Sequence, residues 1–204
     1  MLSMDSKRAG LALVLGAAFA TAACRKNDSG IADTALVAVD TAAAGVADTG
    51  LVAPAAGLND ASIVYVLDNA SKLDSAAGSV AATKGTGSDV RDFGKRMERD
   101  HHALRKQGED LAKRLKVTPE APSNDDSQAS YDKTMSMLNG AAKGKDFDKA
   151  YIDNEVAYHM AVLQTVVAAM HVVQNAELKN LIQKAAPSIQ GHLDLAESIQ
   201  AKMK

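Results

Sequence analysis

The chain has 204 residues, of which 47% are hydrophobic and 24% charged, so it can hold one well-packed domain and some unstructured length, but not two large domains. Its formal net charge is -2 and basic residues alternate with acidic ones, which argues against nucleic acid as a partner. Aromatic residues make up only 3% and Trp is absent, and a core built from Ala, Leu, Val and Met favours an all-α fold.

Residues 1–23 have the features of an export signal. Two basic residues precede an apolar run from Leu11 to Ala23, which is too short to span a bilayer permanently. Cys24 follows small residues, as in the lipobox of bacterial lipoproteins, although Thr21 stands where those proteins usually have Leu. We therefore expect Cys24 to be the lipidated first residue of the mature protein. Cleavage among the alanines by the ordinary signal peptidase is the alternative.

Lipidation would attach the protein to a membrane, in the periplasm or at the outer membrane, without spanning it. Cleavage without lipidation would give a secreted periplasmic protein instead. The following residues, 24–58, consist largely of Ala, Thr, Asp, Val and Gly with no sustained helical period. Their small apolar side chains cannot offset the entropic cost of ordering the backbone. This segment is predicted to be a disordered tether in front of a domain over residues 59–204.

Four long stretches of the domain have helical periodicity and predict an antiparallel four-helix bundle. They run from Asp60 to Lys84, Ser88 to Val117, Asp146 to Val173 and Ala176 to Met203. Very short joints link the first two stretches and the last two, which makes each pair antiparallel neighbours, and Ser88 is the predicted N-cap of the second helix. The longer connection between the pairs has room for a short helix from Gln128 to Leu138.

Each long stretch has one apolar seam, and each seam contains one titratable residue. These residues are Asp74, His101, His159 and His192. Counted outward from the short joints at about 1.5 Å per residue, all four lie at nearly the same height, near the middle of the bundle. Burying them without partners would cost several kcal/mol, and shared coordination of a metal ion removes most of that cost. The seams therefore predict a buried metal site, with a hydrogen-bonded polar layer as the metal-free alternative.

Three acidic residues near the seams complete the candidate set. Glu155 precedes His159 by four residues and points about 40° away from it around the helix, so it is the candidate for a second carboxylate ligand. Glu98 forms an E-x-x-H pair with His101, the spacing used in di-iron carboxylate bundles, but it lies at the edge of the seam. Asp100 can orient a neighbouring histidine through its ring N–H. Glu98 and Asp100 are therefore predicted to support the ligands from outside.

Short patterns in three of the helical stretches stand in a characteristic order. They are the pair Asp100 and His101, the F-D-x-x-Y sequence over residues 147–151 and the P-x-x-x-x-H-L sequence over residues 187–193. This order resembles the exported, ferritin-like bacterial family known as domain of unknown function 4142, over roughly residues 60–201. The resemblance implies a ferritin-like bundle in the periplasm or on the outer surface, with no settled biochemical activity. It supports the aspartate and three histidines as a set, with Glu generally found in the family at position 74.

Three functions fit this sequence. The first is a tethered envelope protein that holds a transition-metal ion, such as zinc, iron, manganese or copper, through its Asp/His cluster. The second is a metal-dependent oxidase or peroxide-handling enzyme, which is weaker because the E-x-x-H spacing occurs only once. The third is a metal-free structural or stress-related envelope protein with a buried histidine layer. The balance is against an enzyme, no catalytic residue is assigned, and the sequence indicates no substrate or protein partner.

Overall fold

The structure is a computed structural model that describes residues 57–203. This part of the chain contains five α-helices and no strand, so the predicted all-α fold is confirmed. The helices are α1 (Asp60–Lys84), α2 (Ser88–Leu115), α3 (Ser127–Gly140), α4 (Lys145–Val172) and α5 (Ala176–Ala201). The predicted signal, Cys24 and nearly all of the predicted tether lie outside the described residues. Leu58, the last residue of the predicted tether, is buried against the core.

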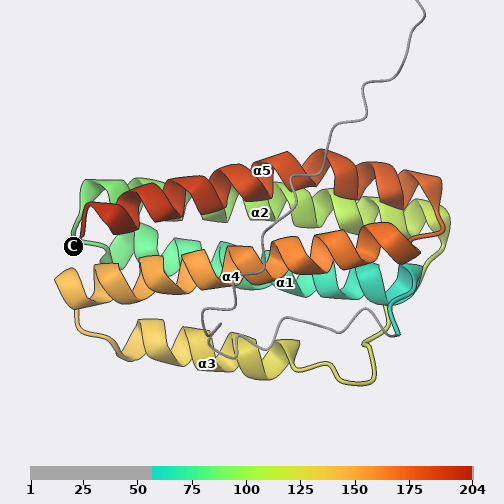
Figure 1. Cartoon of the computed structure of the whole chain (residues 1–204). Helices are drawn as coiled ribbons and strands as arrows, with labels where there is room; N and C mark the ends of the chain where they lie inside the picture. The colour runs from blue at the N-terminus through green and yellow to red at the C-terminus, as the bar shows by residue number, and fades with distance from the viewer. Residues whose placement is uncertain (1–56, 204) are drawn as a thin grey trace, which may run out of the picture. The chain divides into compact units, whose positions relative to one another are not determined.

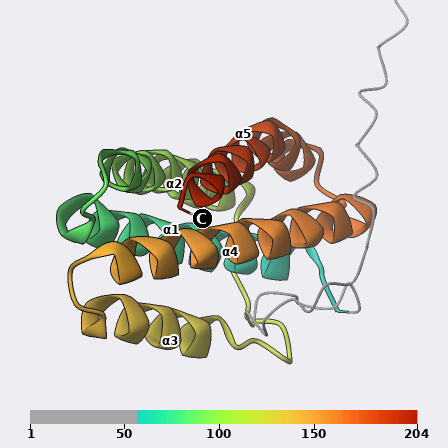
Figure 2. The same ribbon diagram turned by 60° about the vertical axis from the view of Figure 1, so that its left-hand side comes forward.

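The four long helices lie side by side as two antiparallel hairpins, α1–α2 and α4–α5 (Figure 1). The hairpins meet where α2 contacts α5 and where α1 contacts α4. The shorter α3 lies on the outside, against α1 and α4 (Figure 2). It occupies the connection in which the sequence leaves room for a short helix. None of the helices within residues 57–203 has the length and apolar character needed to cross a membrane.

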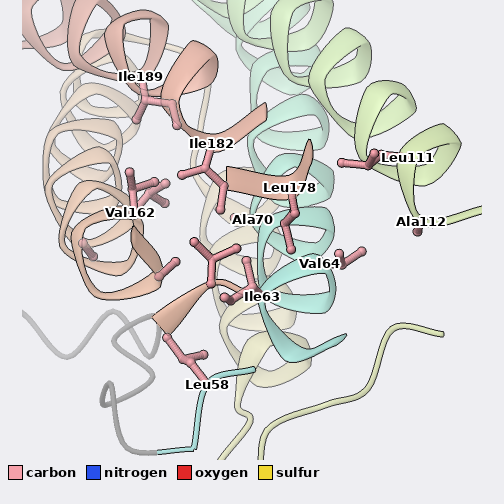
Figure 3. Packing of buried hydrophobic residues seen from close by; sticks show 14 of the residues in the cluster. Leu58, Ile63, Val64, Ala70, Leu111, Ala112, Val162, Leu178, Ile182 and Ile189 are labelled. Atoms are coloured by element: carbon pink, nitrogen blue, oxygen red, sulfur yellow. The ribbon is translucent and has the colours of Figure 1, made fainter. Parts of the chain in front are cut away.

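Apolar side chains from both hairpins fill the interior in two separate clusters. The larger one includes Ile63, Val162 and Ile182, which point toward one another from α1, α4 and α5 (Figure 3). The smaller one lies nearer the α1–α2 turn and includes Phe93 and Phe147. Between these clusters, each long helix contributes buried polar side chains. The core therefore consists of two apolar halves with a polar layer between them.

The backbones of α1 and α2 approach closely where Gly78 faces Gly94. A Cβ atom on Gly94 would lie 2.7 Å from the carbonyl oxygen of Gly78, and one on Gly78 would lie 2.6 Å from the carbonyl oxygen of Gly94. Any larger side chain would force the two helices apart. The contact also positions two polar residues, since Asp74 lies one turn before Gly78 and His101 lies two turns after Gly94.

The α1–α2 turn is held by a carboxylate of α4. Asp148 accepts hydrogen bonds from the backbone N–H groups of Thr86, at 2.8 Å, and Gly87, at 2.7 Å, and from the Thr86 hydroxyl. Its negative charge lies at the N-terminus of α2, where the helix dipole favours an anion. The prediction that Ser88 is the N-cap is wrong, because Gly87 occupies that position and makes no side-chain cap. The contact from Asp148 instead secures the backbone there.

The α4–α5 turn is held in the same way by a carboxylate of α1. The two oxygens of Asp60 accept hydrogen bonds from the backbone N–H groups of Gln174 and Asn175, each at 2.9 Å. Each hairpin therefore supplies the acid that fixes the turn of the other. The two carboxylates also fix how far one hairpin can slide along the other, which keeps the polar residues of all four helices at one height.

Candidate metal centre

A cluster of five buried titratable side chains forms the polar layer of the core. Asp74 comes from α1, His101 from α2, Glu155 and His159 from α4, and His192 from α5. None of the five is more than 4% exposed. The structure thus brings together the four seam residues and the neighbouring glutamate, at the depth that counting from the turns predicts.

The three imidazole rings face one another. Their centroids lie 5.2 Å apart for His101 and His192, 5.5 Å for His159 and His192, and 5.6 Å for His101 and His159. One ring nitrogen from each histidine lies within 4.8 Å of the nitrogens of the other two. Two nitrogens bound to one ion at about 2.1 Å are at most about 4.2 Å apart. Small side-chain movements are therefore enough to place all three on one ion.

Hydrogen bonds orient two of these rings and leave one nitrogen of each directed into the cluster. His159 Nδ1 lies 3.0 Å from the backbone carbonyl oxygen of Glu155, so Nδ1 is the donor and Nε2 carries the lone pair. His192 Nε2 lies 3.1 Å from Oδ2 of Asp100, which leaves the lone pair on Nδ1. An acceptor that fixes the tautomer of a histidine is the usual support for a metal ligand. Asp100 therefore lies where a residue that orients a ligand is predicted.

The two carboxylates lie next to two of the histidines. Asp74 Oδ2 is 3.4 Å from His101 Nε2, and Glu155 Oε2 is 3.4 Å from His159 Nδ1. Ligand atoms of Asp74, Glu155 and His159 also lie within 4.8 Å of one another. The cluster therefore has a histidine side, made by α2, α4 and α5, and a carboxylate side, made by α1 and α4.

Most polar atoms of the cluster have no hydrogen-bond partner within residues 57–203. These seven atoms are both oxygens of Glu155, Oδ2 of Asp74, both ring nitrogens of His101, Nε2 of His159 and Nδ1 of His192. A buried polar atom without a partner destabilises a fold by about 1–3 kcal/mol. Seven such atoms in one buried cluster are therefore costly unless they bind something. A cation satisfies lone pairs of nitrogen and oxygen together.

Burial keeps the histidines of the cluster neutral. Burial and the neighbouring rings hold the pKa of His101 well below its ordinary value. Burial also lowers the pKa of His159 to about 4. The pKa of His192 is lowered by burial as well, although Asp100 raises it in part. A neutral imidazole is the form that binds a metal, so these ligands have no proton to lose near neutral pH.

The same burial favours the protonated form of both carboxyl groups. It raises the pKa of Glu155 to about 8, an increase that the adjacent Tyr151 hydroxyl partly offsets. Burial and, to a lesser extent, the charge of Glu155 hold the pKa of Asp74 well above its ordinary value. No Lys or Arg in residues 57–203 forms an ion pair with either group. While the neighbouring histidines are neutral, no cationic side chain of residues 57–203 pairs with either group, so an added cation would favour the ionisation of both.

Two side chains differ from the sequence-based picture. Glu98 is exposed on α2 while His101 points inward, so the structure does not bring Glu98 to the cluster. Tyr151 is fully buried, and its hydroxyl lies beside Glu155 without the geometry of a hydrogen bond. The seams do not include this tyrosine. Its spacing of one helical turn before Glu155 is the signal that points to it.

The family model described as domain of unknown function 4142 matches residues 42–199. The chain belongs to this family. The match to the 4142 family includes all five helices apart from the last two residues of α5. Neither a curated protein nor a solved structure matches the chain. Because the description of the 4142 family states no function, the function is inferred from the chemistry of the cluster.

Proposed function

We propose that this member of the 4142 family binds one divalent transition-metal ion in the middle of its helical bundle. His101, His159 and His192 are the nitrogen ligands in this proposal, and Asp74 and Glu155 supply carboxylate oxygens. The observation that carries it is the convergence of seven buried polar atoms without hydrogen-bond partners. A metal ion removes the cost of burying these atoms and uses the lone pairs that the surrounding hydrogen bonds leave free.

The charges of the cluster agree with a divalent ion. Three neutral imidazoles contribute no charge, while ionised Asp74 and Glu155 contribute one negative charge each. One divalent ion makes the centre neutral, which is the favourable state for a group of charges in an apolar core. Binding therefore draws a proton from each carboxyl group that is protonated in the metal-free protein.

The ligand types indicate which ions fit. Imidazole nitrogen with carboxylate oxygen suits zinc, iron, manganese or copper(II). Calcium and magnesium take oxygen ligands almost exclusively, so three histidines argue against them. When bound, such an ion acts as a Lewis acid toward water or another small ligand. We rank the binding of an ion above an oxidase or peroxide-handling activity, because the di-iron scaffolds need more glutamates than this cluster has.

We also infer that the fold is the antiparallel, ferritin-like four-helix bundle implied by the family resemblance, with α3 added on its outside. The leader pattern of residues 1–23 supports export, and the residues before Cys24 support lipidation of that cysteine. In this proposal residues 24–56 tether the bundle to a membrane of the cell envelope. The metal-free alternative, a structural envelope protein, keeps the same fold and location.

Metal analysis of the mature protein, purified without an affinity tag, tests the proposed function. After treatment with a chelator and dialysis against zinc, we expect about one equivalent per chain by mass spectrometry. His159→Ala should lose this loading while its helical circular dichroism spectrum stays close to that of the wild type. His102→Ala is the matched control, since His102 is exposed beside His101 on the same helix and should leave loading unchanged. A wild type without bound zinc, or full loading of His159→Ala, would contradict the proposal.

A further inference from the structure

A cleft between α2 and α5 connects the surface with the histidine side of the cluster. It has a volume of about 230 Å³, and both His101 and His192 belong to its lining. That volume is enough for several water molecules. Asp74 and Glu155 do not line the cleft. A molecule that enters it therefore meets the rings of His101 and His192, whose nitrogens without partners are buried, and meets neither Asp74 nor Glu155.

The cleft would give solution access to a metal ion held by the three histidines. The carboxylates approach the cluster from α1 and α4, and the cleft reaches it between α2 and α5. Metal sites that keep one position free of protein ligands bind water or substrate there, whereas closed sites are structural. The arrangement is thus that of a centre that can take a ligand from solution.

The charges along the cleft favour an anion. Lys184 lines it and forms no ion pair with the residues that the structure describes. The acidic residue of the lining, Asp100, is already paired with Arg99 at 2.8 Å, with His192 at 3.1 Å and with Arg96 at 3.6 Å. These contacts compensate the negative charge of Asp100. The lysine is the charge that an incoming ligand meets.

We propose that the α2–α5 cleft admits a small inorganic anion, of the size of azide or hydroxide, to the ion held by His101, His159 and His192. Lys184 attracts the anion, and polar side chains such as Ser188 and Gln107 border its path. This inference rests on the proposed function, because the anion binds to the ion. It makes the cluster an accessible centre with a ligand position that the protein itself does not fill.

Azide binding to the cobalt(II)-loaded full-length mature protein tests this inference. Cobalt(II) absorbs visible light according to its ligands, so titration with azide should change the absorption spectrum and reach saturation. Lys184→Gln should weaken the azide affinity by about two- to fivefold at low ionic strength, as expected for one accessible charge. Lys179→Gln, at another exposed lysine of α5 that does not line the cleft, should leave it unchanged.

A second variant blocks the cleft itself and has its own control. Ser188 is exposed and lines the cleft, so Ser188→Phe should fill the cleft without disturbing the core. We expect this variant to bind cobalt normally and to lose azide binding at least tenfold, while Ser198→Phe, at an exposed position outside the cleft, behaves like the wild type. Normal cobalt loading with no azide-dependent spectrum, or an azide affinity that Ser188→Phe does not change, overturns the inference alone. Failure to bind cobalt overturns the proposed function as well.

Discussion

Glu155 combines complete burial with a carboxyl group that has no hydrogen-bond partner within the described residues. Its pKa is about 8 in the folded protein, compared with 4.5 for an ordinary glutamate. Between these two values the folded, metal-free protein keeps a proton that the unfolded chain has lost. Because the folded state binds more protons there, the free energy of unfolding falls as pH rises through this range.

We therefore expect the metal-free protein, kept in a chelator, to become easier to unfold with urea as the pH is raised from about 7 to about 8. The three histidines oppose this change near pH 7, because folding lowers their pKa values and the unfolded rings still bind some protons there, but their effect fades toward pH 8. Glu155→Gln removes the titrating group and should show a smaller change. A wild-type stability that stays constant or rises over this range would contradict the explanation.

The candidate metal ligands could be predicted from the sequence for a simple reason. Each of the four helices has one titratable residue in an apolar seam, and regular helices joined by very short turns make depth a matter of counting. Supporting residues are harder to predict, because their position depends on side-chain direction. Glu98 and Asp100 lie one residue to either side of Arg99, yet only Asp100 reaches His192 across the α2–α5 contact. Which of the two side chains reaches His192 depends on how α2 is oriented against α5. That orientation cannot be read from the sequence of one helix.

At the scale of helices, the contact between Gly78 and Gly94 determines how closely α1 and α2 pack. The atoms nearest to an added Cβ are backbone atoms of the facing helix, which cannot move aside as a flexible side chain would. Gly108 lies further along α2, and a Cβ atom there would have nothing within 4 Å. One helix therefore contains a glycine that packing requires and another that packing does not require.

We expect Gly94→Ala to lower the free energy of unfolding by about 1–3 kcal/mol, since overpacking forces the helices apart. Gly108→Ala should be neutral or should raise it by about 0.5–1 kcal/mol, because alanine has the higher helix propensity. Urea unfolding monitored by circular dichroism measures both variants. Equal effects of the two substitutions would show that the close approach of α1 and α2 does not limit the size of the residue at position 94.

The positions at which the helices begin and end could also be largely predicted from the sequence. The predicted range Asp60 to Lys84 coincides with α1, because periodicity and the following glycines mark its end. The second helix ends at Leu115 and not at Val117, since Lys116 adopts a left-handed conformation with φ of 55° that stops the helix. Helical periodicity could not predict that Asp148 holds the α1–α2 turn or that Asp60 holds the α4–α5 turn. These contacts join residues 61 to 115 positions apart, and local periodicity contains no information about such pairs.

At the scale of the whole molecule, the cluster lies between two apolar halves of the core. An ion bound there would contact three of the four long helices through histidine and the remaining one through Asp74. Binding that occurs only in the folded state stabilises that state. The centre would therefore serve the fold as well as any ligand chemistry.

The location of the molecule can be tested independently of the metal. We expect bacterial cells that express the full chain to incorporate labelled palmitate into it and to retain it in the membrane fraction, because a lipid on Cys24 anchors it. Cys24→Ser should remove the label and release the protein into the periplasmic fraction. Folding should be unaffected, since residue 24 precedes the helical domain. A wild type without label would favour cleavage by the ordinary signal peptidase.

Because each hairpin turn is held by a carboxylate of the other hairpin, the order of synthesis affects when each turn can be stabilised. Asp148, which closes the first turn, is synthesised about 60 residues after that turn, and Asp60, which closes the last turn, is made long before it. A chain that has been synthesised only as far as α2 therefore lacks the carboxylate that holds the α1–α2 turn. Each hairpin depends on a carboxylate of the other hairpin to hold its turn. We therefore expect the two hairpins to fold together.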